Sequence, residues 1–101
     1  MSEQTSVLPE IYSLSDNYPN PFNPVTTINY KLPKDSEVNM VIYNMMGQKV
    51  RTLVSGQIKA GSYNVTWDGL NEASVQVPSG VYINHLRAGD YNKIQKMILL
   101  R

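Results

Sequence analysis

The chain contains no cysteine, so disulfides, thiolate nucleophiles and zinc–thiolate sites are all excluded. Histidine, the residue that most often acts as a general base, occurs only once. Charged residues make up only 17% of the chain, and the formal net charge is +1. The nearest approach to a basic cluster is Lys93, Lys96 and Arg101. Because binders of nucleic acid or membrane surfaces usually carry a clustered basic excess, we expect neither partner.

Long hydrophobic runs are also missing. The run at residues 97–100 is far shorter than the ~20 apolar residues of a membrane span. At the N-terminus no basic segment precedes an apolar one, so no signal peptide is predicted. If the protein is exported, we expect this chain to be a piece of a longer polypeptide.

Helix-forming residues such as Ala and Glu are scarce, whereas Asn, Ser and Thr are abundant, which favours strands and turns. The length of 101 residues, 42% of them hydrophobic, suits one domain with a core. Apolar and polar residues alternate with a period of two in several segments. The predicted strands are residues 27–32, 38–43, 48–54, 62–67, 81–86 and 91–100, with turns at 33–36, 44–47, 68–69 and 88–90 and a loop at 55–61.

This pattern of short strands and regular turns predicts an all-β fold, an antiparallel β-sandwich of about seven strands. Residues 81–86 are apolar on both faces and are expected to form a central strand. The last strand is expected at a sheet edge, with a solvent-exposed stretch at Lys93 and Gln95. The predicted core comprises Ile28, Tyr30, Val38, Met40, Ile42, Val65, Trp67 and Val81.

Residues 17–24 read Asn-Tyr-Pro-Asn-Pro-Phe-Asn-Pro, and three prolines in six residues exclude a helix. We expect an extended loop that packs on the core through Tyr18 and Phe22. The predicted organisation is a linker or N-terminal extension at residues 1–16, with a possible short strand at 11–14, followed by a β-sandwich domain at residues 17–101.

Three features are candidates for chemistry, and each also has a structural interpretation. His85 has no acidic neighbour in the sequence and fits a strand residue better than a general base. Asp68, Asn71 and Glu72 carry oxygens that suit calcium, but their spacing is that of a turn. A sugar-stacking platform could be built from Tyr12, Tyr18, Tyr43, Tyr82 and Tyr91, although tyrosines commonly pack in the core. We therefore predict no catalytic residue, no cofactor and no metal.

An ordered series of motifs carries a resemblance over residues 17–101. It comprises the proline segment, then Thr26, Ile28, Tyr30, Leu32-Pro33, Ile42-Tyr43-Asn44, Gly47-Gln48-Lys49-Val50, Ala60-Gly61, Val65 with Trp67-Asp68-Gly69, and Ser79-Gly80-Val81-Tyr82. In this order the series resembles the C-terminal sorting domain of proteins exported by the type IX secretion system. It is similar also to the immunoglobulin-like domain of the flagellar hook-capping protein. Relatives usually have glycine near Ser74, at a turn with positive φ, so we expect the loop at residues 71–76 to differ in shape.

The resemblance implies an immunoglobulin-like sandwich that serves as a non-catalytic sorting or cell-surface attachment module of a secreted bacterial protein. It implies as partners an outer-membrane translocon, a surface sortase and an upstream cargo domain, and a location outside the cell or on its surface, reached through the periplasm. It places part of the signal in the last strand, at Lys96, Met97, Ile98, Leu99, Leu100 and Arg101. The alternatives are a carbohydrate-binding or adhesive accessory module of an extracellular enzyme and a structural domain like that of the hook cap.

Overall fold

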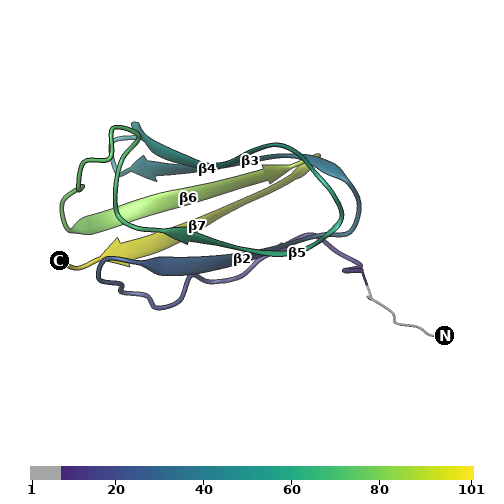
Figure 1. Cartoon of the computed structure of the whole chain (residues 1–101), viewed down its shortest axis with the longest axis horizontal. Helices are drawn as coiled ribbons and strands as arrows, with labels where there is room; N and C mark the ends of the chain where they lie inside the picture. The colour runs from purple at the N-terminus through teal and green to yellow at the C-terminus, as the bar shows by residue number, and fades with distance from the viewer. Residues whose placement is uncertain (1–7) are drawn as a thin grey trace.

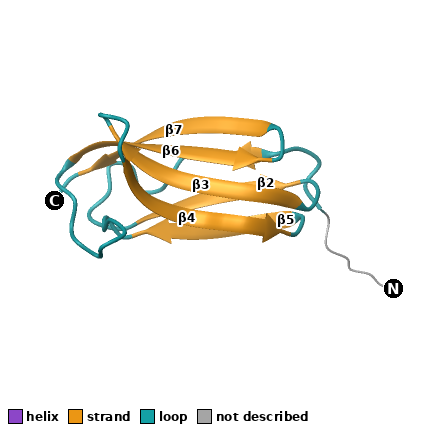
Figure 2. Ribbon diagram, turned by 90° about the horizontal axis from the view of Figure 1, so that it is seen from above, coloured by secondary structure: helices purple, strands orange, loops and turns teal. Residues whose placement is uncertain are grey.

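The computed structural model describes residues 8–101, which form two antiparallel sheets packed face to face (Figures 1 and 2). One sheet has the order β1-β2-β5 and the other the order β4-β3-β6-β7. No helix occurs among these residues. The predicted all-β, immunoglobulin-like sandwich is thus confirmed. The strands are β1 (Ser13–Leu14), β2 (Thr26–Leu32), β3 (Ser36–Asn44), β4 (Lys49–Ile58), β5 (Gly61–Trp67), β6 (Gly80–Ala88) and β7 (Tyr91–Leu99).

The core lies between the sheets and is built by the alternation of each strand. Six predicted core residues are buried: Ile28, Tyr30, Val38, Met40, Ile42 and Trp67. Val65 and Val81 are only half-buried. On β6 the residues that face the core are Tyr82, Leu86 and Ala88, so Val81 points to the outer side. The expected central position of this strand is confirmed, because β6 lies between β3 and β7.

Strand β4 is longer than its sequence indicates, and the prediction of a loop at residues 55–61 is wrong. Ser55, Gly56 and Gln57 pair with β3 and extend the strand to Ile58. Glycine and serine weaken a strand signal, but a long partner strand supplies the ladder that holds them. The connection to β5 is therefore short, and the amide of Ala60 donates to the Asp35 carboxylate at 2.8 Å.

The sandwich includes residues of the expected N-terminal extension. Ser13 and Leu14 pair with β2, and Leu14 is buried in the core. Tyr12 stacks on Tyr91 with ring centroids 5.3 Å apart, and its hydroxyl lies 2.8 Å from the Ser36 hydroxyl. The fold thus begins before residue 17, and the first part of the expected extension, residues 1–7, lies outside the described residues.

The proline segment is anchored by residues that differ in part from those predicted. Phe22 is buried as expected, but Tyr18 is 80% exposed, so the packing role predicted for Tyr18 is wrong. The backbone of Tyr18 exchanges two hydrogen bonds of 2.9 Å with Thr27, and its side chain projects outward. The buried Asn17 holds the segment instead, donating to the Thr26 hydroxyl at 3.0 Å and to the Pro19 carbonyl at 3.3 Å.

Candidate recognition end of the sandwich

Strand β7, which holds most of the candidate recognition residues, lies at an edge of the four-stranded sheet, as predicted. Alternation divides these residues between two environments. Met97 and Leu99 are fully buried in the core, and Ile98 is half-buried. Lys96, Leu100 and Arg101 are exposed. In the folded domain, Met97 and Leu99 support the strand and cannot themselves contact a partner.

The proline segment forms hydrogen bonds with the outer edge of β7 near the end of this strand. The Phe22 amide donates to the Ile98 carbonyl and the Leu100 amide to the Phe22 carbonyl, both at 2.9 Å. The Ile98 amide donates to the Asn20 side chain at 3.0 Å. Although β7 lies at the sheet edge, its outward-pointing backbone groups are therefore occupied from Ile98 onward. Because outward-pointing backbone groups alternate along a strand, the open part of the edge is at Asn92, Ile94 and Lys96.

Arg101 is tied to the loop at residues 68–79. Its guanidinium donates to the Val77 carbonyl and to the Gly69 carbonyl, each at 2.7 Å. Its backbone amide donates to the Ser79 hydroxyl at 2.8 Å. A Cβ at Gly69 would lie 2.8 Å from the guanidinium, so glycine, here with φ of +76°, leaves room for this contact. The side chain of Arg101 thus has a structural role.

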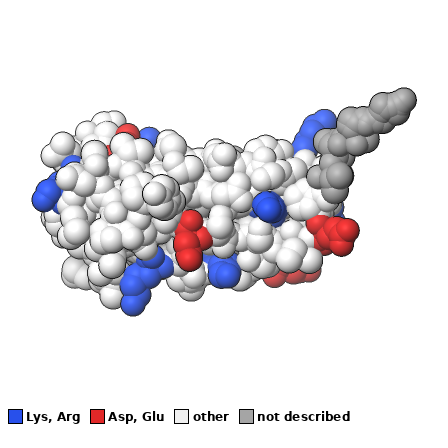
Figure 3. All heavy atoms as spheres, turned by 90° about the horizontal axis from the view of Figure 1, so that it is seen from below, with Lys and Arg blue, Asp and Glu red and all other residues white. Residues whose placement is uncertain are grey.

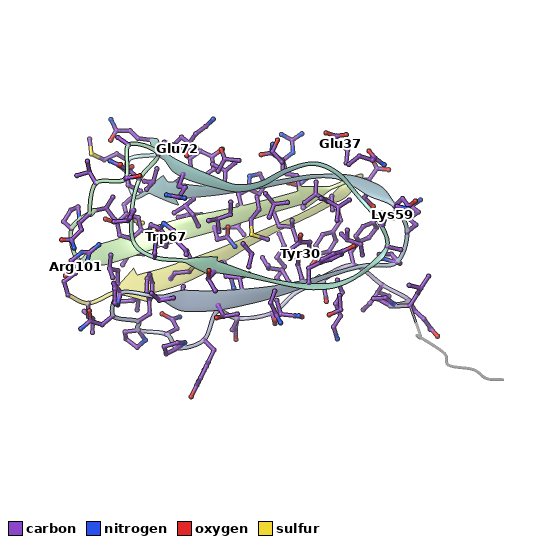
Figure 4. All side chains as sticks on the ribbon, in the orientation of Figure 1. Tyr30, Glu37, Lys59, Trp67, Glu72 and Arg101 are labelled. Carbon is purple, nitrogen blue, oxygen red and sulfur yellow. The ribbon has the colours of Figure 1, made fainter. Side chains whose placement is uncertain are left out.

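Trp67 and Tyr82 hold the same loop from the core side. The Trp67 indole donates to the Leu70 carbonyl at 2.9 Å, and the Tyr82 hydroxyl donates to the Pro78 carbonyl at 2.6 Å. Their rings meet edge to face at 5.3 Å. Burial raises the pKa of the Tyr82 phenol above its ordinary value, and the nearby Arg101 guanidinium acts in the opposite direction. Trp67 and Arg101 lie at the same end of the sandwich (Figure 4).

Ser74 takes a backbone conformation that favours glycine. Its φ is +62°, in the left-handed region. Asn71 caps this turn, because its side-chain oxygen accepts from the amides of Ala73 and Val75 at 2.9 and 3.0 Å. The turn at Ser74 thus has the positive φ that glycine would serve, and a difference in loop shape from related domains stays a prediction.

Replacing Ser74 with Gly is expected to stabilise the domain. A left-handed backbone conformation costs a non-glycine residue about 1–2 kcal/mol, and the substitution removes this cost. Glycine has more conformational freedom in the unfolded chain, which cancels roughly 0.5–1 kcal/mol of the gain. We expect the free energy of unfolding to rise by about 0.5–1 kcal/mol, measured by urea denaturation. Ala73→Gly, next to it and without positive φ, should instead destabilise.

The candidate calcium ligands are engaged with the backbone. Asp68 accepts from the Leu70 amide at 3.1 Å, and Glu72 accepts from the Thr52 amide at 2.9 Å. Within residues 8–101 no three acidic or histidine side chains converge on one point. The nearest polar partner of His85 is Asn92, with 2.6 Å between the imidazole Nε2 and the amide oxygen.

The tyrosines proposed for a sugar platform are dispersed. Tyr82 is buried, whereas Tyr12 and Tyr91 stack on each other against the core. Tyr43 is half-buried on β3, in the four-stranded sheet. Tyr18 pairs with β2, in the other sheet. The five rings therefore do not form one surface.

These features define an immunoglobulin-like β-sandwich module. The proline segment, the Trp67–Gly69 turn and the start of β6 meet at one end of the fold, whereas Gly61 of the Ala60-Gly61 motif pairs with Leu32 at the opposite end. The sequence profile of the FlgD Ig-like domain matches residues 22–91. The chain therefore belongs to the FlgD Ig-like domain family. No curated protein has significant sequence similarity to the chain. In the described part of the chain no helix is long and apolar enough to cross a membrane.

Three solved structures have a similar fold. Dimeric latent PorU from Porphyromonas gingivalis superimposes with a TM-score of 0.66 at 19% identity, over 84% of this chain and 9% of PorU. FlgD from P. aeruginosa superimposes with a TM-score of 0.57 at 23% identity, over 75% of this chain and 66% of FlgD. PorZ from P. gingivalis, a surface component of the type IX secretion system, gives 0.55 at 22% identity, over 89% of this chain and 11% of PorZ. The chain thus corresponds to about a tenth of PorU and PorZ.

Proposed function

We propose that this chain is the non-catalytic C-terminal sorting or cell-surface attachment module of a secreted bacterial protein, recognised by the type IX secretion machinery. The observation that carries the proposal is the meeting of three of the sorting-domain motifs at one end of the fold. The proline segment, the Trp67–Gly69 turn and the start of β6 all lie against the last residues of β7. The likeness of the fold to parts of PorU and PorZ supports the same assignment.

A non-catalytic role is supported by what the polar groups of these motifs do. The indole of Trp67, the hydroxyl of Tyr82 and the guanidinium of Arg101 all donate to backbone carbonyls of the loop at residues 68–79. Groups committed to backbone carbonyls are held in place and have no free role in proton transfer. The motifs thus specify the shape that a partner recognises.

The proposal includes partners and location. A translocon in the outer membrane and a surface sortase would bind the module, and an upstream cargo domain would be carried with it. The protein would pass through the periplasm and end outside the cell or on its surface. The sorting domain is proposed at residues 17–101, together with the β1 residues that pack on it.

The test is a fusion of a signal peptide, a fluorescent reporter and the whole chain, expressed in a host with the type IX system. The reporter is expected at the cell surface, measured by protease accessibility on intact cells. The same reporter without the module should stay in the periplasm. If the complete fusion also stays there while native substrates are exported normally, the sorting proposal is wrong. A glycan array would then test the adhesive alternative.

A further inference from the structure

The two outer faces of the sandwich differ in chemistry. On the three-stranded sheet, Asn29 donates to Asn64 at 3.0 Å and to Ser62 at 3.3 Å, and threonines 27 and 66 form the next cross-strand pair. The solvent-facing side of each sheet in a two-layer sandwich usually carries polar residues. In the view of Figure 3 positive and negative side chains are interspersed, and neither sign forms a continuous patch. This face satisfies its own polar groups.

Figure 2 shows the four-stranded sheet from its outer side. This side carries the apolar residues Ile83 and Ile94 at positions that are usually polar when they face solvent. The register aligns Lys49, Tyr43, Ile83 and Lys96 in one row across the sheet. The next row is Thr52, Val41, His85 and Ile94. Ile94 is 63% exposed although it lies in the middle of a strand. An exposed apolar cluster in an otherwise polar surface marks an interaction site.

A groove of about 290 Å³ lies over these rows. It is lined by Tyr43, Ile83, His85 and Ile94 and closed at one side by Met45 of the β3–β4 turn. Asn44 fixes this turn, accepting from the amides of Met46 and Gln48 at 2.9 and 3.0 Å. Met45 and Met46 are therefore exposed on a rigid support. Tyrosine and methionine are enriched at protein interfaces, and methionine adapts to the shape of a partner.

Basic residues predominate on the strands that form this groove. The four strands of the sheet contain five basic residues and one acidic residue, Glu37. Glu37 lies three rows from Tyr43, next to Arg87 and away from the groove. Lys49 and Lys96 stand at the two ends of the Tyr43–Ile83 row, on the two edge strands. A second carboxylate, that of Glu72, approaches the sheet at the Thr52 amide of β4, and neither Glu37 nor Glu72 lines the groove. A partner that fits must therefore bring negative charge on both sides of an apolar centre.

We propose that this groove docks an extended segment of a partner protein in which an apolar side chain is flanked by carboxylates. The inference rests on the proposed function and deepens it, since the partner would be the component of the export machinery that recognises the module. A groove of about 290 Å³ is at the lower limit of ligand pockets and suits side chains of a protein segment. An apolar centre with a charged rim is the usual anatomy of such an interface.

The first test uses the export fusion with Ile94→Glu, which places a carboxylate in the groove. The amount of reporter at the cell surface is expected to fall to about a tenth of that of the unmodified fusion. The introduced carboxylate would repel the carboxylates of the partner and would be buried on docking. Thr66→Glu is the matched control, because it adds the same charge on the exposed outer face of β5. Circular dichroism and thermal melting confirm that both variants fold. If the unmodified fusion is not exported, the proposed function fails. If it is exported and Ile94→Glu is exported equally, the groove inference is overturned.

The second test uses purified chain and a series of synthetic seven-residue peptides with Phe, Leu or Met at the centre. Each is made with Glu on both sides or with Lys on both sides. Amide chemical shifts should move around Tyr43, Ile83 and Ile94, and the Glu peptides should bind about tenfold tighter, as two exposed charge pairs allow. Lys49→Glu combined with Lys96→Glu should reverse this preference. Equal binding of the two peptide sets, no binding by any of them, or shifts elsewhere would overturn the inference. So would binding to phosphatidylglycerol vesicles in place of the peptides.

Discussion

Trp67→Ala is expected to lower the free energy of unfolding by about 3–5 kcal/mol, the usual cost of deleting a large buried aromatic. Trp67 is fully buried between Phe22 and Tyr82, with ring centroids 5.6 and 5.3 Å away. Its removal would leave a cavity and would also deprive the Leu70 carbonyl of its donor. Because small domains have only about 5–15 kcal/mol of stability, this single change should remove a large part of it.

Urea denaturation followed by circular dichroism measures the effect. Tyr18→Ala is the matched control, because Tyr18 is an aromatic residue with its side chain in solvent. We expect this control to change stability by less than about 0.5 kcal/mol. A loss below about 1 kcal/mol for Trp67→Ala would contradict the placement of this residue at the centre of the core.

The strands themselves could be predicted from the sequence because their alternation is local. Residues 27–32 and 62–67 alternate cleanly, and both appear as strands. The inner face of β2 is buried, whereas that of β5 is half-buried except at Trp67. Residues 81–86 are apolar on both faces, and local pattern cannot decide which face is inner. The inner face is decided by the pairing of this strand with β3 and β7. Tyr82 is therefore buried, whereas Val81 had been predicted to be the core residue.

The candidate site was harder to predict because its parts are distant in the sequence. The groove combines residues of β3, β6 and β7, which only the sheet register brings together. One signal was present, since Ile83 and Ile94 are apolar at positions where a solvent-facing strand surface should be polar. The capping of the β7 edge by Asn20 and Phe22 had no local signal, because it depends on contacts across almost the whole chain.

The polar pair in the core was also missed, and Gln95 was wrongly expected to be solvent-exposed. Asn84 is fully buried and donates to the Gln95 side-chain oxygen at 2.9 Å. Gln95 in turn donates to the Ser15 carbonyl at 2.8 Å, which fixes the orientation of its amide. The Asn84 side-chain oxygen has no hydrogen-bond partner among the described residues. The pair joins β6 and β7 to the N-terminal segment, at the cost of one unsatisfied acceptor.

Asn84→Asp is expected to destabilise the domain in a strongly pH-dependent way. Burial disfavours a carboxylate, so the pKa of the introduced carboxyl should be raised in the folded state above its unfolded value of about 3.9. Below about pH 4 the group is neutral in both states and, as an acid, can still donate to Gln95, so stability should lie near that of the unchanged protein. As pH rises the unfolded state loses its proton first, and stability falls by about 1.4 kcal/mol per pH unit.

With a pKa raised by three units or more, as in fully buried carboxyls, the loss at pH 7 is about 4 kcal/mol. Urea denaturation of both proteins at pH 3, 5 and 7 measures this difference. Asn64→Asp is the control, because Asn64 is exposed on β5 and its oxygen is already an acceptor for Asn29. The control should show no comparable slope. A difference between Asn84→Asp and the unchanged protein that stays constant from pH 3 to pH 7 would show that this position is open to water. The core would then lack the polar link that ties β6 and β7 to Ser15.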